Sequence, residues 1–353
     1  MADASNLARP SLTGRRWYRR SVATARILLT VAITMLGLIT LTFFIGRVLP
    51  FDPVVAILGD DSSREAYDRV YRQLGLDRPL YEQFFTYMRD VLSFDFGRSL
   101  SSGRPVIDDI TRVFPATVEL ALLSIFFGVA IGVPLGVAAA ARQGSWIDQL
   151  IRVFALIGFS APNFWLGLVG LAVFFAGLGW VGGPGRLSTF YQFDIEIRTG
   201  LILIDSALMQ RWDIFQDAVS RLVLPVGILA YGAMAFIARM TRSFMLEQLS
   251  QEYIIAARAK GVSRTAVIWV HAFPNIAVQL VTVIALAFGF LLEGAVLTET
   301  VFAWPGLGRY MTTALLRGDM NAVLGCVIVI GLIFITLNLL CDLFYRSFDP
   351  RTR

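Results

Sequence analysis

The sequence predicts an all-α integral membrane protein with six transmembrane helices. Hydrophobic residues make up 56% of its 353 residues and charged residues only 16%, whereas soluble domains carry about 25% charged residues. The apolar residues gather in uncharged blocks at 27–46, 120–141, 153–185, 222–238, 272–292 and 320–341. A helix needs about 20 apolar residues to cross a bilayer core, and five of the blocks have about that length. One very large soluble core, the alternative, fits this pattern less well.

The block lengths set the expected boundaries of the helices. The third block is too long for one crossing, so we expect a helix followed by an outside loop that starts near Gly179. An Arg-rich segment at 1–26 precedes the first helix, and a tail at 343–353 follows the last one. Between them the six helices are expected at about 27–46, 116–141, 153–178, 222–240, 273–297 and 320–342.

Arginines near the chain ends indicate the orientation. Positive residues close to helix ends mark the cytoplasmic side of a membrane protein. Before the first helix, a single acid, Asp3, stands against Arg9, Arg15, Arg16, Arg19, Arg20 and Arg26. The tail carries Arg346, Arg351 and Arg353. Both termini are therefore expected in the cytoplasm, and the segment 47–113 outside, with a short helix over 64–76 that ends at Gly75.

Glycines and a proline mark special places in the second and third helices. Gly128, Gly132 and Gly136 recur every four residues, a spacing that lets another helix approach closely, although incidental glycines are common in membrane helices. Pro162 and Asn163 lie near the middle of the third helix. Proline frees a backbone carbonyl, so this stretch is either a local break that faces a pathway or a kink that serves packing.

Glu293 interrupts the fifth helix. A charge inside the membrane is costly and usually faces a cavity or a partner. Glu293 is therefore either a pathway residue or, if it lies near the outer end, a residue that reaches the headgroups.

The polar stretch EYIIAARAKGV, residues 252–262, lies between the fourth and fifth helices on the expected cytoplasmic side. Ser250 suits a helix cap and Glu252 suits the first turn. Tyr253, Ala256, Ala257 and Lys260 share one face by helical spacing. Gly261 then breaks the helix, Ser263 starts the next one, and Pro274 sets the start of the fifth span. The short helix is either a docking element for a partner or an interfacial anchor.

No metal site is expected. His271 is the only histidine, and Cys326 and Cys341 are separated by 15 residues on one predicted helix, which is roughly 22 Å.

Several stretches together resemble one family over nearly the whole chain. EYIIAARAKG (252–261), followed by HAFPN (271–275), resembles the EAA motif of binding-protein-dependent ABC importer permeases. The dipeptide and oligopeptide branch (DppB/OppB-like) is resembled by FDFGRSL (94–100), FPATVELALL (114–123), SAPNFWLGL (160–168), TGLILID (199–205), RMTRSFMLE (239–247), LTETVFAWPGLGRY (297–310) and DPR (349–351). The resemblance implies a type I ABC importer permease (MetI-like) domain over 114–342, in a bacterial inner membrane.

The resemblance also implies the roles of two groups of residues. The loop 247–271 would form the coupling helix that sits in a cleft of an ATPase subunit, with Glu252, Ala256, Ala257, Gly261 and Pro274 as its motif residues. The loop after the fifth helix would lie near the outer gate, beneath a docked binding protein. Its candidate pathway or gate residues join Pro162, Asn163 and Glu293, and they are Glu299, Trp304, Pro305 and Gly306. Trp304 could instead be a simple interfacial anchor.

The chain lacks an ATP site of its own. A phosphate-binding loop reads G-x-x-x-x-G-K-[ST], and the only lysine, Lys260, is not in such a motif. By resemblance, the partners are a second related permease subunit forming a heterodimer, two ATPase subunits that hold ATP and magnesium, an extracytoplasmic substrate-binding protein and membrane lipid. No nucleic acid partner and no bond chemistry are expected.

Three alternatives stay open at this point. A stand-alone secondary transporter would favour several ionisable residues inside the membrane, and few acids interrupt these blocks. An intramembrane enzyme would have to use His271. Within the resembled family, the solute is expected to be a peptide, with nickel, glutathione or opines as alternatives, because the sequence does not name it.

Overall fold

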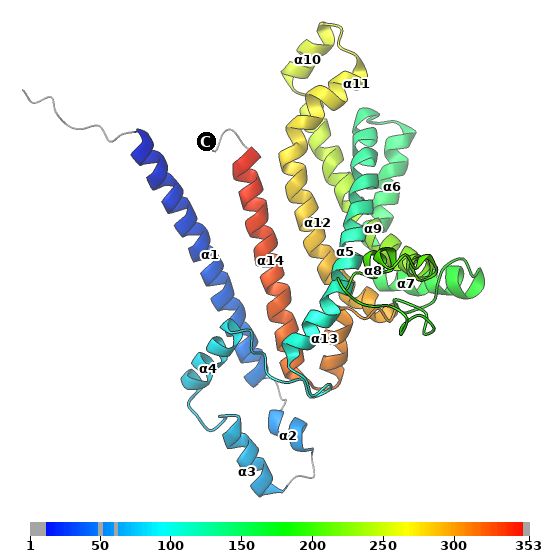
Figure 1. Ribbon diagram of the computed structural model, residues 1–353. Helices are drawn as coiled ribbons and strands as arrows, with labels where there is room; N and C mark the ends of the chain where they lie inside the picture. The colour runs from blue at the N-terminus through cyan, green and yellow to red at the C-terminus, as the bar shows by residue number, and fades with distance from the viewer. Residues whose placement is uncertain (1–11, 49–51, 60–62, 349–353) are drawn as a thin grey trace, which may run out of the picture.

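The structure is a computed structural model that describes residues 12–48, 52–59 and 63–348. Arg9, Arg351 and Arg353, which were used for the orientation, lie outside the described residues. Every regular element in the described part of the chain is helical. Long helices run side by side, and short helices gather at the ends of the long ones (Figure 1). The expected all-α fold is confirmed.

The elements follow the chain in this order. The first long helix, α1 (Leu12–Val48), leads to three short helices, α2 (Pro53–Leu58), α3 (Arg64–Gln73) and α4 (Leu80–Leu92). The central part is α5 (Val106–Ala141), α6 (Trp146–Ser160), α7 (Asn163–Gly170), η1 (Leu171–Gly177), α8 (Ile202–Leu208) and α9 (Trp212–Leu249). The last part is α10 (Glu252–Ala259), α11 (Arg264–Ala266), η2 (Val267–Ala272), α12 (Phe273–Val301), α13 (Leu307–Leu316) and α14 (Met320–Phe348).

Five stretches in the described residues are helical, long and apolar enough to cross a membrane. They lie in α1, α5, α9, the continuous run from α11 to α12, and α14. A bent pair of helices, α6 followed by α7 and η1, raises the number of possible crossings to six if the pair counts as one crossing. The long helices continue past the apolar blocks: α9 covers Trp212–Leu249, where the apolar pattern predicted only 222–240.

The helix expected at 153–178 is divided into two helical segments. The chain bends by 97° between Trp146–Ser160 and Asn163–Gly177. Proline disfavours the helical conformation in the residue before it, and Ala161, which precedes Pro162, is extended with φ −78° and ψ 129°. Of the two interpretations of this stretch, the structure supports a break rather than a small kink.

The glycine pattern in α5 marks a close helix contact. A Cβ atom added to Gly128 would lie 2.9 Å from the Cβ of Ala233, and one added to Gly136 would lie 2.6 Å from the carbonyl oxygen of Ala238. Gly132 has a similar position against Met234. The backbones of α5 and α9 therefore touch along this stripe, as the four-residue spacing predicts.

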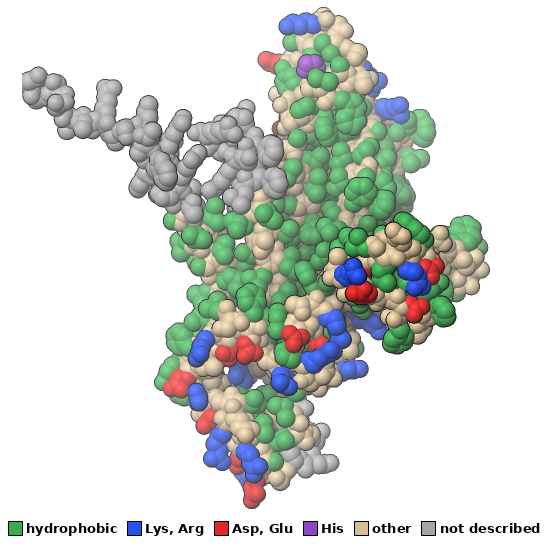
Figure 2. All heavy atoms as spheres, viewed as in Figure 1, with side chains coloured by type: hydrophobic (Ala, Val, Ile, Leu, Met, Phe, Trp, Pro, Cys, Tyr) green, Lys and Arg blue, Asp and Glu red, His purple; other side chains and the backbone are tan. Residues whose placement is uncertain are grey.

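The two ends of the molecule differ in composition. The side chains along the long helices are mostly hydrophobic, and charged side chains gather at both ends and over the region of α7 and α8 (Figure 2). Helices α10 and α11 form one end, which the described ends of α1 and α14 also approach, while α2, α3 and α13 lie at the opposite end (Figure 1). The expected helix over 64–76 ends at Gln73, and Gly75 has a positive φ of 66°.

We predict that Gly136→Ala destabilises the fold. The added methyl group would overlap the backbone of α9, and overpacking of this kind costs about 1–3 kcal/mol. The measurement is the thermal unfolding midpoint of the purified protein in detergent. Gly37→Ala in α1 is the matched control, because nothing lies within 4 Å of the added atom there. An equal midpoint for both variants would contradict the close contact.

Candidate functional site

The expected docking helix exists as α10, and one side chain anchors it. Ile254 is fully buried, and Ala257, three residues further, packs against the same core cluster. The residues that point away are exposed, among them Ile255 at 60% and Ala256. Because successive residues turn by about 100° on a helix, the free face of α10 runs through Glu252, Ala256 and Lys260.

Two details of the predicted loop need correction. Ala257 was placed on the free face, but it is only partly exposed because it packs inward beside Ile254. Ser250 was expected to cap α10, but it is the C-terminal cap of α9, and its hydroxyl donates to the carbonyl oxygen of Glu247 (2.8 Å). Gln251 precedes α10 instead and makes no side-chain cap. Because α9 extends to Leu249, Ser250 ends α9 and is not available as the cap of α10.

The end of the loop follows the prediction at two residues. Gly261 has a φ of +79°, a conformation that glycine adopts without the steric cost of a Cβ. The hydroxyl of Ser263 accepts a hydrogen bond from the backbone N–H of Ala266 (3.3 Å) and so caps α11. Together they reverse the chain and direct it into the fifth long helix.

Pro274 stands in the first turn of α12 (Phe273–Val301), as the sequence predicts for the start of the fifth long helix. The helical path is continuous from Arg264 through Leu292, and Pro274 lies inside it. Proline has no N–H to donate and its ring clashes with the carbonyl four residues before. The wider π-helical turns of η2, at Val267–Ala272, stand directly before it and relieve that clash.

A side-chain link joins α10 to the start of α12. The side-chain amide of Asn275 donates to the hydroxyl of Tyr253 (2.9 Å) and to the carbonyl oxygen of His271 (2.8 Å). Tyr253 also donates to the side chain of Gln248 at the end of α9 (3.0 Å). A movement of α10 is thereby linked to both long helices that flank it.

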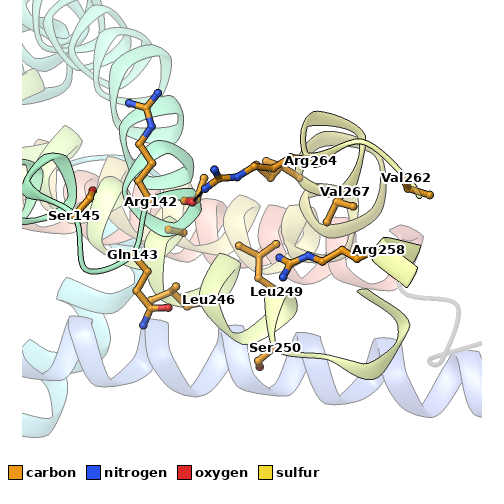
Figure 3. Close-up of a pocket in the computed structure, with 13 residues that line it drawn as sticks. Arg142, Gln143, Ser145, Leu246, Leu249, Ser250, Arg258, Val262, Arg264 and Val267 are labelled. Carbon is orange, nitrogen blue, oxygen red and sulfur yellow. Dashed lines mark hydrogen bonds between the residues drawn. The ribbon is translucent and has the colours of Figure 1, made fainter. Parts of the chain in front are cut away.

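A basic cavity of about 790 Å³ lies behind this helix, between the α5–α6 turn and the α10–α11 loop. Arg258 and Arg264 extend from the loop toward the turn, and Arg142 lines the cavity from the turn itself (Figure 3). Arg264 donates to the carbonyl oxygen of Ala141. None of the three arginines forms an ion pair with a carboxylate of the described residues.

At the other end, two of the candidate gate residues are buried. Glu299 is fully buried and accepts hydrogen bonds from the hydroxyl of Thr117 (2.6 Å) and the backbone N–H of Arg309 (3.0 Å). Trp304 is fully buried as well, and its indole N–H donates to the carbonyl oxygen of Ala116 (3.0 Å). The interpretation of Trp304 as an interfacial anchor is therefore wrong.

The turn between α12 and α13 depends on its glycine. A Cβ atom at Gly306 would lie 2.3 Å from the carboxylate of Glu299, so the turn closes over that side chain only because Gly306 has none. Pro305 beside it is exposed. The hydrogen bonds of Glu299 and Trp304 hold the turn against α5. The turn therefore has a structural role.

A buried ion pair holds a second loop against α5. The sequence did not predict this pair. The guanidinium of Arg186 donates through Nε to the carboxylate of Glu119 (3.1 Å), and that carboxylate also accepts from the backbone N–H of Leu203 (2.9 Å). In the sequence, Glu119 stands out only as a lone acid at the edge of an apolar block. Its partner, 67 residues later, could not be chosen among many arginines.

Pro162 and Asn163 lie where three helices meet. Asn163 is the first residue of α7, and its side chain lies 3.3 Å from a Cβ atom added to Gly294 of α12 and 3.7 Å from one added to Gly232 of α9. The break thus faces small residues of both long helices. Glu293 precedes Gly294 in α12, and its side chain lies outside the described part of the structure.

The comparisons with known proteins identify the family. Residues 132–353 match the family described as binding-protein-dependent transport system inner membrane component, and residues 18–121 match its N-terminal counterpart. The chain belongs to this family. It is thus a multi-pass inner-membrane component of a binding-protein-dependent transport system, and a permease by its relatives.

The similar proteins are permeases over almost their whole length. The chain is 40% identical to the probable D,D-dipeptide transport system permease protein DdpB of Escherichia coli K12, over 91% of this chain and 94% of the relative. It is 41% identical to the dipeptide transport system permease protein DppB of the same strain, over 91% and 95%. The di/tripeptide permease DppB of Pseudomonas aeruginosa is 39% identical, over 91% and 95%.

A solved structure supports the fold. The inward-facing MetNI methionine ABC transporter matches with a TM-score of 0.50 and 21% identity, covering 67% of this chain and 95% of that one. The expected type I importer fold is confirmed.

We predict that Trp304→Ala lowers the amount of folded protein in the membrane. Removal of a fully buried tryptophan leaves a cavity that costs about 3–5 kcal/mol. Trp304→Phe should cost less, since it keeps most of the ring and removes only the indole N–H donor. Fluorescence-detected size exclusion of solubilised protein measures the folded fraction, and a normal fraction for Trp304→Ala would contradict the structural role.

Proposed function

We propose that this chain forms half of the membrane pathway of an ATP-driven importer for dipeptides or short oligopeptides. The substrate class is inferred from one observation. Over nine tenths of its length, the chain is 39–41% identical in sequence to permeases named for dipeptides or di/tripeptides. The exposed helix α10, joined to α9 and α12 through Tyr253, supplies a contact for a separate ATPase.

In the proposed assembly, this chain pairs with a second, related permease subunit. Two ATPase subunits hold ATP and magnesium on the cytoplasmic side, and a substrate-binding protein delivers the solute outside. The chain itself holds no cofactor and performs no bond chemistry. ATP binding closes the ATPases, the coupling helices follow, and the pathway opens outward; hydrolysis then returns it to the inward-open state.

Dipeptide uptake tests this function. Proteoliposomes that contain the complete complex, with ATP inside and the binding protein outside, should accumulate a radiolabelled dipeptide, and uptake should stop without ATP. Uptake that continues without ATP would favour a stand-alone secondary transporter. ATP-dependent uptake of nickel, glutathione or an opine in place of dipeptides would keep the importer and change its substrate.

We predict that Ala256→Glu detaches or uncouples the ATPase. Ala256 lies on the free face of α10, and a mismatched charge buried at an interface costs about 2–5 kcal/mol, which weakens binding more than about tenfold. Co-purification of the ATPase subunits and ATP hydrolysis stimulated by the loaded binding protein are the two measurements. Ala256→Ser, which keeps a small side chain, is the control. Wild-type values for Ala256→Glu would remove α10 from coupling.

The orientation gives a further prediction. In a background without Cys326 and Cys341, a cysteine at Ser101 should react with a membrane-impermeant thiol reagent added to intact cells. A cysteine at Thr265, at the opposite end of the molecule, should react only after the membrane is permeabilised. Both positions are exposed, so the reverse pattern of labelling would invert the proposed topology.

A further inference from the structure

Helix α9 is covered on three sides and open on the fourth. Helix α5 covers it at Ala233, helix α12 covers it where Phe236 and Phe290 meet with ring centroids 6.1 Å apart, and helix α6 covers it at Tyr231, whose hydroxyl donates to the carbonyl oxygen of Phe154 (2.8 Å). Arg239 lies on the remaining side, between the directions of α6 and α12, and its side chain is exposed.

Arg239 is held in place by aromatic rings rather than by a carboxylate. Its guanidinium carbon lies 4.5 Å from the ring centroid of Phe159 in α6 and 5.8 Å from that of Phe236. Two other arginines of α9 have carboxylate partners: Arg221 pairs with Asp217 and Arg242 with Asp148. Within the described residues, the charge of Arg239 has no such partner.

A cavity of about 410 Å³ lies beside this guanidinium, between α6 and α9. Ile151, Ala155 and Leu156 form apolar walls on the α6 side. Arg152 and Arg242 also line the cavity, but both pair with Asp148. Arg239 adds a positive charge, and the two aromatic rings already fix the position of its guanidinium. An apolar cavity with one available guanidinium complements a small solute that combines an apolar side chain with a carboxylate.

The same open side of α9 continues to the break before α7. Gly232, Phe236, Arg239 and Ser243 follow one another at helical spacing, so they lie on one side of α9. Asn163 lies beside Gly232 at one end of this row. The seven steps from Gly232 to Arg239 span about 10 Å along the helix axis, which is about the length of three residues in extended form.

We propose that Arg239 binds a carboxylate of the transported solute on this open side of α9. Arg239 follows directly on the uncharged block 222–238. There it would either extend to the lipid headgroups or face a water-filled pathway, in which it keeps its hydration until the solute arrives. Arg239 thus gives the pathway a preference for solutes with a free carboxylate. The inference rests on the proposed function, because it assigns a binding residue to the same pathway.

Equilibrium binding to the purified permease–ATPase complex, without the binding protein, tests the assignment. The probes are a radiolabelled dipeptide and its C-terminal amide. Arg239→Gln should weaken binding of the free acid about tenfold, the loss expected for one charged hydrogen bond, and leave binding of the amide unchanged. Arg239→Lys should restore part of the affinity, since it keeps the charge without the planar fork.

Arg317→Gln is the matched control, because Arg317 is also exposed but lies after α13, next to the outer end of α14. It should bind both probes as the wild type does. Equal losses for acid and amide, no loss for either, or no dipeptide binding by the wild-type complex would overturn the proposal. Arg239→Gln could instead remove co-purified anionic phospholipid or the second permease subunit while dipeptide binding stays normal. In that case the open side of α9 binds that lipid or subunit, and the proposal fails. Proteoliposome uptake by the wild type keeps this failure distinct from failure of the proposed function.

Discussion

The close packing of α5 on α9 is the contact on which the rest of the structure depends. Three glycines remove the side chains that would hold the two backbones apart, so that main-chain atoms of α9 lie within van der Waals reach of α5. In a membrane, burial of apolar surface does not drive helices together, because lipid tails are as apolar as the side chains. Close backbone packing therefore supplies a large part of the attraction between these helices. Once the pair is formed, the remaining helices pack around it.

Polar side chains of α5 hold the loops at the end of the molecule that contains α13. Glu119 accepts hydrogen bonds from both Arg186 and the backbone N–H of Leu203, and Thr117 links the turn after α12 to Glu299. Each of these carboxylates is buried and has several donors, which is the condition under which burial of a charged or polar group is tolerated. These bonds hold this end of the molecule together, although its segments come from distant parts of the chain.

At the opposite end of the molecule, α10 is connected to two long helices. Helix α10 is held by one buried isoleucine and by hydrogen bonds that run from Tyr253 to α9 and α12. The π-helical turns before Pro274 connect α11 to α12 without a break in the helix. A force on α10 therefore reaches the helices that border the open side of α9, where Arg239 lies.

The sequence by itself determined the membrane class, the helix break at Gly261 and the cap at Ser263, because each depends on the composition or the local conformation of a few neighbouring residues. Only the tertiary structure decided which residues face inward. Helical spacing placed Ala257 on the free face, yet the packing of Ile254 turned it toward the core. Spacing also left open whether Pro162 breaks its helix, and it could not show that Trp304 is buried or that Glu119 meets Arg186. These outcomes depend on contacts between residues far apart in the chain, and such contacts are fixed only when the helices pack.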